Sequence, residues 1–194
     1  MKICESSSSI SLFLYLTLLL ILKPKGVVPN PISNKIFSPS TSIPAPQIKY
    51  DVFVSFRGSD IRKNFLSHVL EALSRKRIIV FSDKKLKTGD ELSAIQRAIE
   101  KSLISLVIFS PNFASSHWCL DELVKIVECR ENYGRVLMPV FYQVYPSDVR
   151  HQNGTYKDAF AQHEQKYSLN KVQSWRSALK QSANMSGFDS SLFL

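Results

Sequence analysis

LISLVIFSPNFASSHWCLDEL, residues 103–123, is the most informative stretch of this 194-residue chain. It begins with an apolar run, 103–109, that has the length of a buried strand. A short Ser-rich turn follows, and an amphipathic run, 120–131, leaves that turn. The apolar residues of this second run recur at helical spacing: Leu120, Leu123, Val124 and Val127. The pattern predicts a strand, a turn and a helix that packs on a sheet.

The rest of the chain alternates in the same way. The apolar pattern predicts strands at 50–56, 78–81, 103–109 and 136–144 and from Gly187, and helices over 65–73, 91–101, 120–131, 156–167 and 171–184. Pro139 cannot donate to a ladder, so pairing there is expected to be one-sided or to begin after it. Residues 145–148 are expected to form a turn.

Strands that alternate with helices at this spacing indicate parallel βαβ units. Right-handed crossovers place helices on both faces, which predicts an α/β, three-layer, flavodoxin-like domain with about five parallel strands in the order 2-1-3-4-5. Ligands of such sheets bind beyond the carboxyl ends of the strands. Three segments follow those ends: Arg57-Gly58, the loop from Ser82, and residues 110–122.

Composition divides the chain into an apolar leader or membrane anchor (1–23), a Pro- and Ser-rich linker (24–48), a folded domain (49–188) and a short tail (189–194). The leader contains a largely apolar run of 13 residues, Ile10 to Leu22. As a helix this run would reach about 20 Å, short of the roughly 30 Å core of a bilayer. Only Lys2 precedes the run as a basic residue, and no small-residue cleavage pattern follows it. Membrane tethering and a leader that does not insert both remain open.

The overall composition narrows the class of protein. An apolar fraction of 44% and a charged fraction of 21% are typical of a folded globular protein. The net charge of +9 is spread out, and no nucleic-acid-binding motif accompanies it, so it is only weak evidence for a nucleic-acid partner, which we do not expect. The charge would suit an anionic cofactor equally well. Three cysteines without CxxC spacing indicate a reduced compartment, and the four scattered histidines predict no metal site.

Several enzyme classes lack their sequence signatures here. There is no GxGxxG or P-loop after the first strand and no GxSxG elbow, which argues against Rossmann dehydrogenases, P-loop NTPases and serine hydrolases. Asp51 lies at the wrong end of its strand to be a phosphoacceptor, and the carboxyl ends, where an acid would be needed, hold Ser55, Phe56 and Ser110. Glu122 lies about two positions off the apolar stripe, so it is expected to point away from the core near the start of its helix, where the helix dipole favours an acid. Spacing alone is typical of a solvated acid, but the Ser-rich turn, Trp118 and Cys119 before it favour a function.

Three motifs, Phe109-Ser110, Ala114 to Ser116 and Trp118 to Leu123, resemble the signature of plant Toll/interleukin-1 receptor (TIR) domains. The resemblance extends over about 50–188 and implies an NAD-consuming enzyme of plant immune signalling, with Glu122 as its catalytic residue. One carboxylate can suffice for this chemistry, because nicotinamide is a good leaving group and the carboxylate stabilises an oxocarbenium-like state. The products would be nicotinamide and ADP-ribose or a cyclic ADP-ribose-type molecule. The alternative is a non-catalytic adaptor that docks on other TIR domains.

The same resemblance assigns residues to binding of NAD⁺ as the substrate, with no metal. Arg57, Gly58, Asp60 and Arg62 match a segment that lines the pocket, although solvated arginines in a capped loop would look the same. In relatives a mobile loop completes the site of a neighbouring subunit, and the residues that match this loop here are Lys84, Lys87 and Gly89. Trp118 could cover a flat ring of the substrate or plug the junction between loop and helix.

Self-association with other TIR domains is also implied by the resemblance. Ser67 and His68 match the pair on the first helix that relatives use, and the helical alternation independently places both on the exposed face. Gly187 is assigned to a second self-association surface. The family's final helix should follow Phe188, but six residues remain, so a truncated tail without that helix is expected. The domain is expected in the cytoplasm, either free or tethered by Ile10–Leu22. If that run inserts, the lysines after it outweigh Lys2 before it, so the positive-inside tendency leaves the domain facing the cytosol.

Overall fold

A computed structural model describes residues 44–61, 65–81 and 91–189 of the chain. Its five parallel strands lie in the order β2-β1-β3-β4-β5. In chain order they are β1 (Tyr50–Phe56), β2 (Val80–Phe81), β3 (Ser102–Phe109), β4 (Val136–Phe141) and β5 (Phe188–Asp189). The predicted flavodoxin-like α/β fold and its strand order are confirmed.

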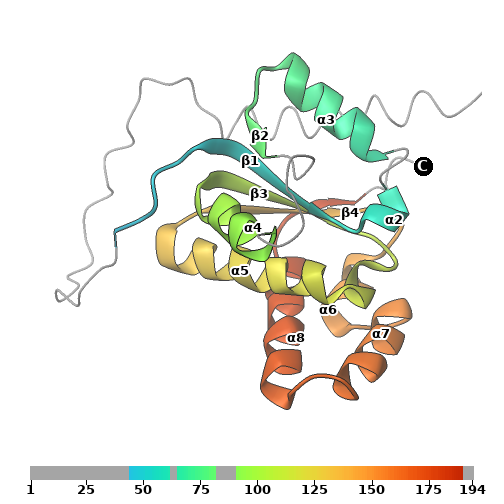
Figure 1. The fold of residues 1–194 in the computed structure, drawn as a ribbon. Helices are drawn as coiled ribbons and strands as arrows, with labels where there is room; N and C mark the ends of the chain where they lie inside the picture. The colour runs from blue at the N-terminus through green and yellow to red at the C-terminus, as the bar shows by residue number, and fades with distance from the viewer. Residues whose placement is uncertain (1–43, 62–64, 82–90, 190–194) are drawn as a thin grey trace, which may run out of the picture.

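Helices cover both faces of this sheet (Figure 1). The described helices are α2 (Gly58–Ile61), α3 (Phe65–Arg75), α4 (Glu91–Glu100), α5 (His117–Tyr133), α6 (Pro146–His151), α7 (Thr155–Glu164) and α8 (Leu169–Ala183), with a 3₁₀ turn, η2 (Phe113–Ser115). Successive strand residues point to opposite faces. Val52 and Val54 therefore pack in the cluster under α3, whereas Phe53 packs in the cluster that α4, α5 and α8 share.

Several elements differ from the sequence prediction. Strand β4 ends at Phe141 rather than at residue 144. Strand β2 pairs over two residues rather than four, and Ile79 before it is 50% exposed. The turn expected at 145–148 is instead the start of α6, because Pro146 occupies the first turn, where a missing N–H costs nothing. Pro139 does allow one-sided pairing, since β4 stays in register with β3 through it while β5 begins opposite Val140.

Helix α5 begins three residues earlier than the apolar period predicts. Ser116 is its N-cap, and the Ser116 hydroxyl accepts a hydrogen bond from the Cys119 backbone N–H at 3.4 Å. At its other end, α5 is capped by Gly134, whose φ of +66° is the left-handed conformation that glycine adopts most easily. These two caps determine which residues of α5 reach the ends of the strands.

Several predictions fall on residues outside the described ranges. They concern the leader, most of the linker, Arg62, the loop with Lys84, Lys87 and Gly89, and the tail after Asp189. Among the helices that the structure does describe, none is long and apolar enough to cross a membrane.

Candidate active site

The candidate active site lies where β1 and β3 end. Ser55, next to last in β1, is fully buried, and its hydroxyl donates a 2.7 Å hydrogen bond to Oε2 of Glu122 on α5. Glu122 is half-buried and is the sixth residue of its helix, beyond the first turn where the dipole acts most strongly. The alternative drawn from spacing alone, a solvated first-turn acid, is therefore wrong. The carboxylate faces the end of the sheet.

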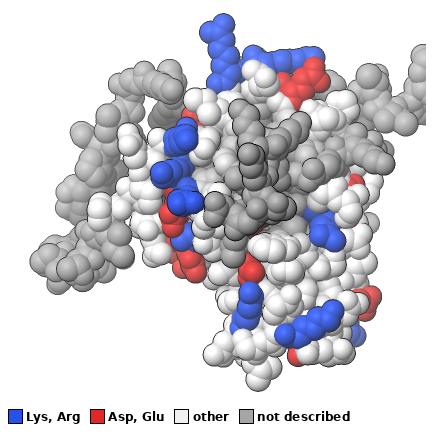
Figure 2. All heavy atoms as spheres, viewed as in Figure 1, with Lys and Arg blue, Asp and Glu red and all other residues white. Residues whose placement is uncertain are grey.

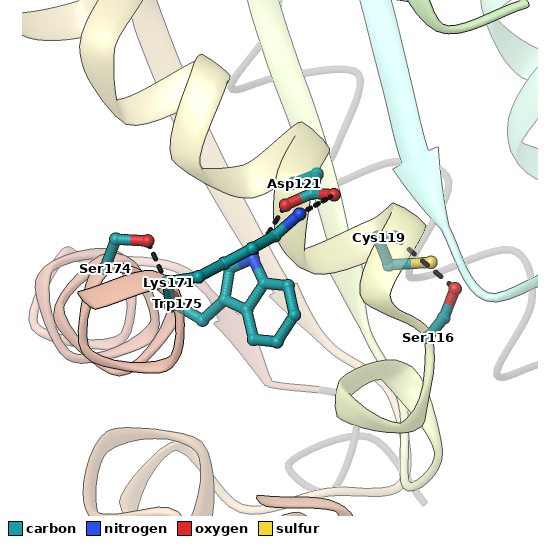
Figure 3. A network of polar contacts seen from close by, with 6 residues as sticks. All are labelled: Ser116, Cys119, Asp121, Lys171, Ser174 and Trp175. Carbon is teal, nitrogen blue, oxygen red and sulfur yellow. Dashed lines mark hydrogen bonds and ion pairs between the residues drawn. The ribbon is translucent and has the colours of Figure 1, made fainter. Parts of the chain in front are cut away.

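The neighbouring acid, Asp121, points the other way and fastens α5 to α8. Figure 3 shows Trp175 and Lys171 of α8 reaching its carboxylate. The Trp175 indole N–H donates to Oδ1 at 2.9 Å and the Lys171 ammonium to Oδ2 at 3.2 Å. Trp175 is fully buried, so Asp121 satisfies a donor that would otherwise be costly to bury. Two consecutive acids thus hold α5 from opposite sides.

Trp118 lies one helical turn before Glu122, on the same face of α5. It is 47% exposed, so its expected alternative role as a buried plug is wrong. Its ring lies against that of His117, with the centroids 4.9 Å apart. An exposed indole next to the carboxylate is a flat apolar surface at the mouth of the site.

Cys119 closes the inner side of the site. Its thiol donates to the Phe56 carbonyl oxygen at 3.5 Å. Burial, and then the negative charge of Glu122, raise the pKa of the Cys119 thiol to about 12. The thiol therefore stays protonated near neutral pH and is not a nucleophile there.

Asp60 joins the two loops that border the site. Its carboxylate accepts hydrogen bonds from the hydroxyls of Ser110 (2.6 Å) and Ser59 (2.9 Å) and from the backbone N–H of Asn112 (3.0 Å). Burial alone would raise the pKa of Asp60, but these hydrogen bonds outweigh it and hold the pKa below its ordinary value. An ionised Asp60 thus fixes the loop after β3 against the segment after β1.

Helix α7 also holds the loop between Ser110 and Ser116, through hydrogen bonds from its side chains to the loop carbonyls. The buried Tyr156 hydroxyl donates to the Ser110 carbonyl at 2.9 Å, and Nε2 of the buried His163 lies 2.8 Å from the Ala114 carbonyl oxygen. The Thr155 hydroxyl donates to the Pro111 carbonyl. Three side chains of one helix therefore set the backbone path that leads into α5.

Arg57 follows β1 directly and lies half-buried, with Gly58 beginning α2 beside it. The Arg57 Nε is buried, and no hydrogen-bond partner for it lies within the described part of the chain. A buried guanidinium N–H without a partner suits an anionic ligand, because such a group is costly to leave unpaired. The site thus combines a carboxylate, an aromatic surface and a cation at one edge of the sheet.

A protein-family model described as "TIR domain" matches residues 49–193. This chain belongs to the TIR domain family. A solved structure with a similar fold is that of the TIR domains of the activated Roq1 resistosome, which directly recognizes the pathogen effector XopQ. It has a TM-score of 0.68 and 48% identity, covering 73% of this chain and 87% of that one.

The relatives of this TIR domain are plant disease-resistance proteins. It is 45% identical over 161 residues to Disease resistance protein RPV1 of Vitis rotundifolia, across 80% of this chain and 11% of RPV1. It is 46% identical over 142 residues to TMV resistance protein N of Nicotiana glutinosa, across 71% of this chain and 12% of that protein. The chain thus spans about a tenth of the length of these relatives.

The residues assigned to self-association in this TIR domain lie away from the Glu122 site. Ser67 and His68 are exposed on α3, as the alternation predicted. Gly187 lies just before β5, where an added Cβ would lie 2.6 Å from the Pro139 carbonyl oxygen. Glycine is therefore required there for close backbone packing, whatever else it does.

Sequence reasoning placed Ser55 and Ser110 at the correct ends of their strands but gave them no role. The contributions of Asp121, Tyr156 and His163 to the TIR site were missed entirely. Tyr156 is 46 residues from its partner Ser110, so no local pattern connects them. A buried aromatic with a polar tip, which usually needs a hydrogen-bond partner, was the only available signal.

Proposed function

We propose that this TIR domain is a signalling NAD⁺ glycohydrolase of plant immunity, active in the cytoplasm and dependent on self-association. The ribose C1′–nicotinamide nitrogen bond breaks, and its electron pair neutralises the pyridinium ring. Water adds to C1′ and loses a proton, so the products are nicotinamide, ADP-ribose and a proton. In a cyclic product a nitrogen of the adenine takes the place of the water.

The observation that carries this proposal is the hydrogen bond from Ser55 to Glu122 at the carboxyl end of the sheet. It holds a carboxylate at the edge where ligands of such folds bind. A carboxylate held there stabilises positive charge that develops on the ribose, and it needs no reorganisation during the reaction.

Two further residues suit the rest of the substrate. The Nε–H of Arg57, which has no partner among the described residues, offers a donor for the pyrophosphate. The exposed indole of Trp118, one turn from Glu122, offers a surface for a flat ring. The Asp60 carboxylate accepts hydrogen bonds from Ser110 and Asn112 in the loop after β3. We therefore assign Asp60 to holding that loop rather than to binding the substrate.

The test compares the full chain with Glu122→Gln, and the measured quantity is nicotinamide released from NAD⁺. Glutamine still accepts the Ser55 hydroxyl hydrogen bond but carries no charge. We expect release to fall by a factor of about 100 or more, the scale of losing one electrostatic stabiliser. Glu131→Gln, an exposed acid near the other end of α5, is the matched control and should retain wild-type activity.

Equal release by wild type and Glu122→Gln would overturn the assignment of Glu122. Background release by both, from folded protein that self-associates, would favour the adaptor alternative. The exposure of Ser67 and His68 on α3 supports that alternative as a second candidate, because an adaptor needs an accessible helix face and no carboxylate beside a pocket.

A further inference from the structure

The edge of the sheet opposite the Glu122 site carries a row of basic residues. Lys49 directly precedes β1, Lys101 precedes β3 and Arg135 precedes β4. Parallel strands begin at the same edge, and the backbone N–H groups of Lys49 and Tyr50 both donate to the Lys101 carbonyl, at 2.8 and 3.1 Å. We call the exposed residues Ile48, Lys49, Arg77, Ile79 and Lys101 the amino edge.

The cations of the amino edge face solvent. Lys49, Arg77 and Lys101 are exposed, whereas Arg135 is half-buried and donates to the carbonyls of Pro46 and Glu100. Figure 2 shows several Lys and Arg side chains, with acids among them, on the left, the side on which β1 begins in Figure 1; further Lys and Arg side chains lie at the top and bottom of the view. Of these cations, Lys49 and Lys101 are neighbours, because the Lys49 backbone N–H donates to the Lys101 carbonyl.

The nearby acids do not cancel this charge. Glu100 is paired with Lys125 at 2.7 Å. Asp51 is half-buried, and its carboxylate accepts the Ile79 backbone N–H at 2.8 Å. The exposed side chains of the amino edge are thus positive on balance.

Exposed aliphatic side chains lie among these cations. Within the described residues five large apolar side chains are exposed, and two of them, Ile48 (39%) and Ile79 (50%), belong to the amino edge. The Ile79 carbonyl accepts the backbone N–H groups of Asp51 and Val52, so Ile79 lies beside the start of β1. A single exposed isoleucine is ordinary, but two among exposed cations form an amphipathic surface.

Helix dipoles explain only part of this pattern. Lys101 follows α4 and Arg77 follows α3, where a cation stabilises the C-terminus of a helix. Lys49 precedes a strand and has no such role. The dipole also gives no reason for isoleucine side chains to lie in water.

We propose that the amino edge docks on an anionic lipid surface. Its cations pair with acidic headgroups, and Ile48 and Ile79 enter the boundary between headgroups and acyl chains. Phosphate groups of a nucleic acid would use the cations but not the isoleucines. The affinity of such a small surface is low, so it needs a second membrane signal.

The chain itself contains a candidate for that second signal. Strand β1 begins at this edge, and the sequence N-terminal to β1 contains the apolar run Ile10–Leu22. The docked orientation also leaves the Glu122 site accessible, because β1 separates the two edges by about 20 Å. The proposal is independent of the catalytic one.

The experiment is lysine acetylation of the full chain, read by mass spectrometry, with and without vesicles. Phosphatidylcholine vesicles are compared with vesicles that also contain phosphatidylserine. We expect phosphatidylserine to slow acetylation of Lys49 and Lys101 several-fold, and added salt to reverse this. Lys157 and Lys166, exposed lysines near α7, are internal controls and should react at the same rate throughout. Ile79→Ser should weaken the protection.

Two outcomes would overturn the proposal. Lys49 and Lys101 could remain as reactive with phosphatidylserine as without it, or all four lysines could be protected alike. A short RNA in place of vesicles gives a further arm. RNA could protect Lys49 and Lys101 as strongly as phosphatidylserine does, and Ile79→Ser could leave both effects unchanged. That result would show that the amino edge binds polyanions in general rather than a lipid surface.

Discussion

Ser55 connects the core of the domain to its chemistry. Its side chain is fully buried in β1, and its hydroxyl donates to a carboxylate that reaches the surface. A buried hydroxyl is expensive without a partner, so the pair also fixes where the Glu122 carboxylate lies. In the proposed reaction the serine is a positioning residue, since it acts through Glu122.

Ser55→Ala is expected to lower kcat/KM for NAD⁺ about 10-fold, the effect of losing one hydrogen bond to a charged group. The measurement is nicotinamide release, with the fold checked by circular dichroism. Ser105→Ala, a buried serine in the interior of β3, is the control and should leave kcat/KM unchanged. Wild-type activity in Ser55→Ala would mean that Glu122 is held in place by other contacts.

Asp60 gives the domain a pH dependence that can be worked out from its contacts. The folded pKa of Asp60 lies below its ordinary value, so its ionised form stabilises the fold at pH values above the unfolded pKa. That stabilisation is lost as the pH falls through the folded pKa. Asp60→Asn is expected to unfold about 1–3 kcal/mol more easily at pH 7.

The difference between wild type and Asp60→Asn should shrink as the pH falls below about 4, because the unfolded wild-type chain then takes up a proton first, and it should be smallest below the folded pKa, where the folded carboxyl is protonated too. Urea unfolding at a series of pH values measures this difference in the free energy of unfolding. Asp158→Asn, an exposed aspartate of α7, is the control. A difference that stays constant across the whole pH series would contradict the role of the ionised form.

At the scale of elements, α7 holds the loop that precedes α5. The side chains of Thr155, Tyr156 and His163 each bond to a different carbonyl of that loop. On α8, the Trp175 indole N–H and the Lys171 ammonium group hold α5 by bonding to Asp121. Helices that carry no proposed catalytic group therefore determine the position of the one that does.

Tyr156→Phe removes the hydroxyl that satisfies the Ser110 carbonyl and is expected to cost about 1 kcal/mol of stability. Nicotinamide release should fall as well, because Ser110 also bonds Asp60 across the site. Tyr133→Phe, which removes a hydroxyl at the far end of α5, should alter neither quantity. A loss of stability with full activity would restrict the role of α7 to folding.

At the scale of the molecule, the parallel sheet separates the proposed functions by edge and face. The carboxyl ends of β1 and β3 hold the Glu122 site, and the amino ends carry exposed cations. The outer face of α3 carries Ser67 and His68, away from both edges. Assembly, catalysis and docking can therefore be tested by separate substitutions.

His68→Ala is expected to reduce self-association without unfolding the domain, because His68 is exposed and lies off the apolar stripe of α3. Sedimentation velocity at high protein concentration measures the effect, together with circular dichroism. His151→Ala, an exposed histidine of α6, serves as the control. Unchanged sedimentation with a normal spectrum would exclude the His68 face as the contact.

The sequence by itself determined the layers, the strand order and the edge that carries the site. Apolar periods of two and 3.6 residues report burial directly, and the alternation of strands with helices restricts the topology to few choices. The buried face of α8, with Val172, Trp175 and Leu179, was predictable for the same reason. Lys84, Lys87, Gly89 and Arg62 lie outside the described residues, so their roles stay predictions.

Only the tertiary structure decided how the polar groups are paired. It turned Glu122 toward Ser55, joined Asp60 to Ser110 and placed Tyr156 under the loop. Each of these hydrogen bonds joins residues that lie 46 or more positions apart. Hydrophobic burial leaves a periodic trace along the chain, whereas a hydrogen bond depends on two groups meeting within about 3 Å, which sequence spacing does not encode.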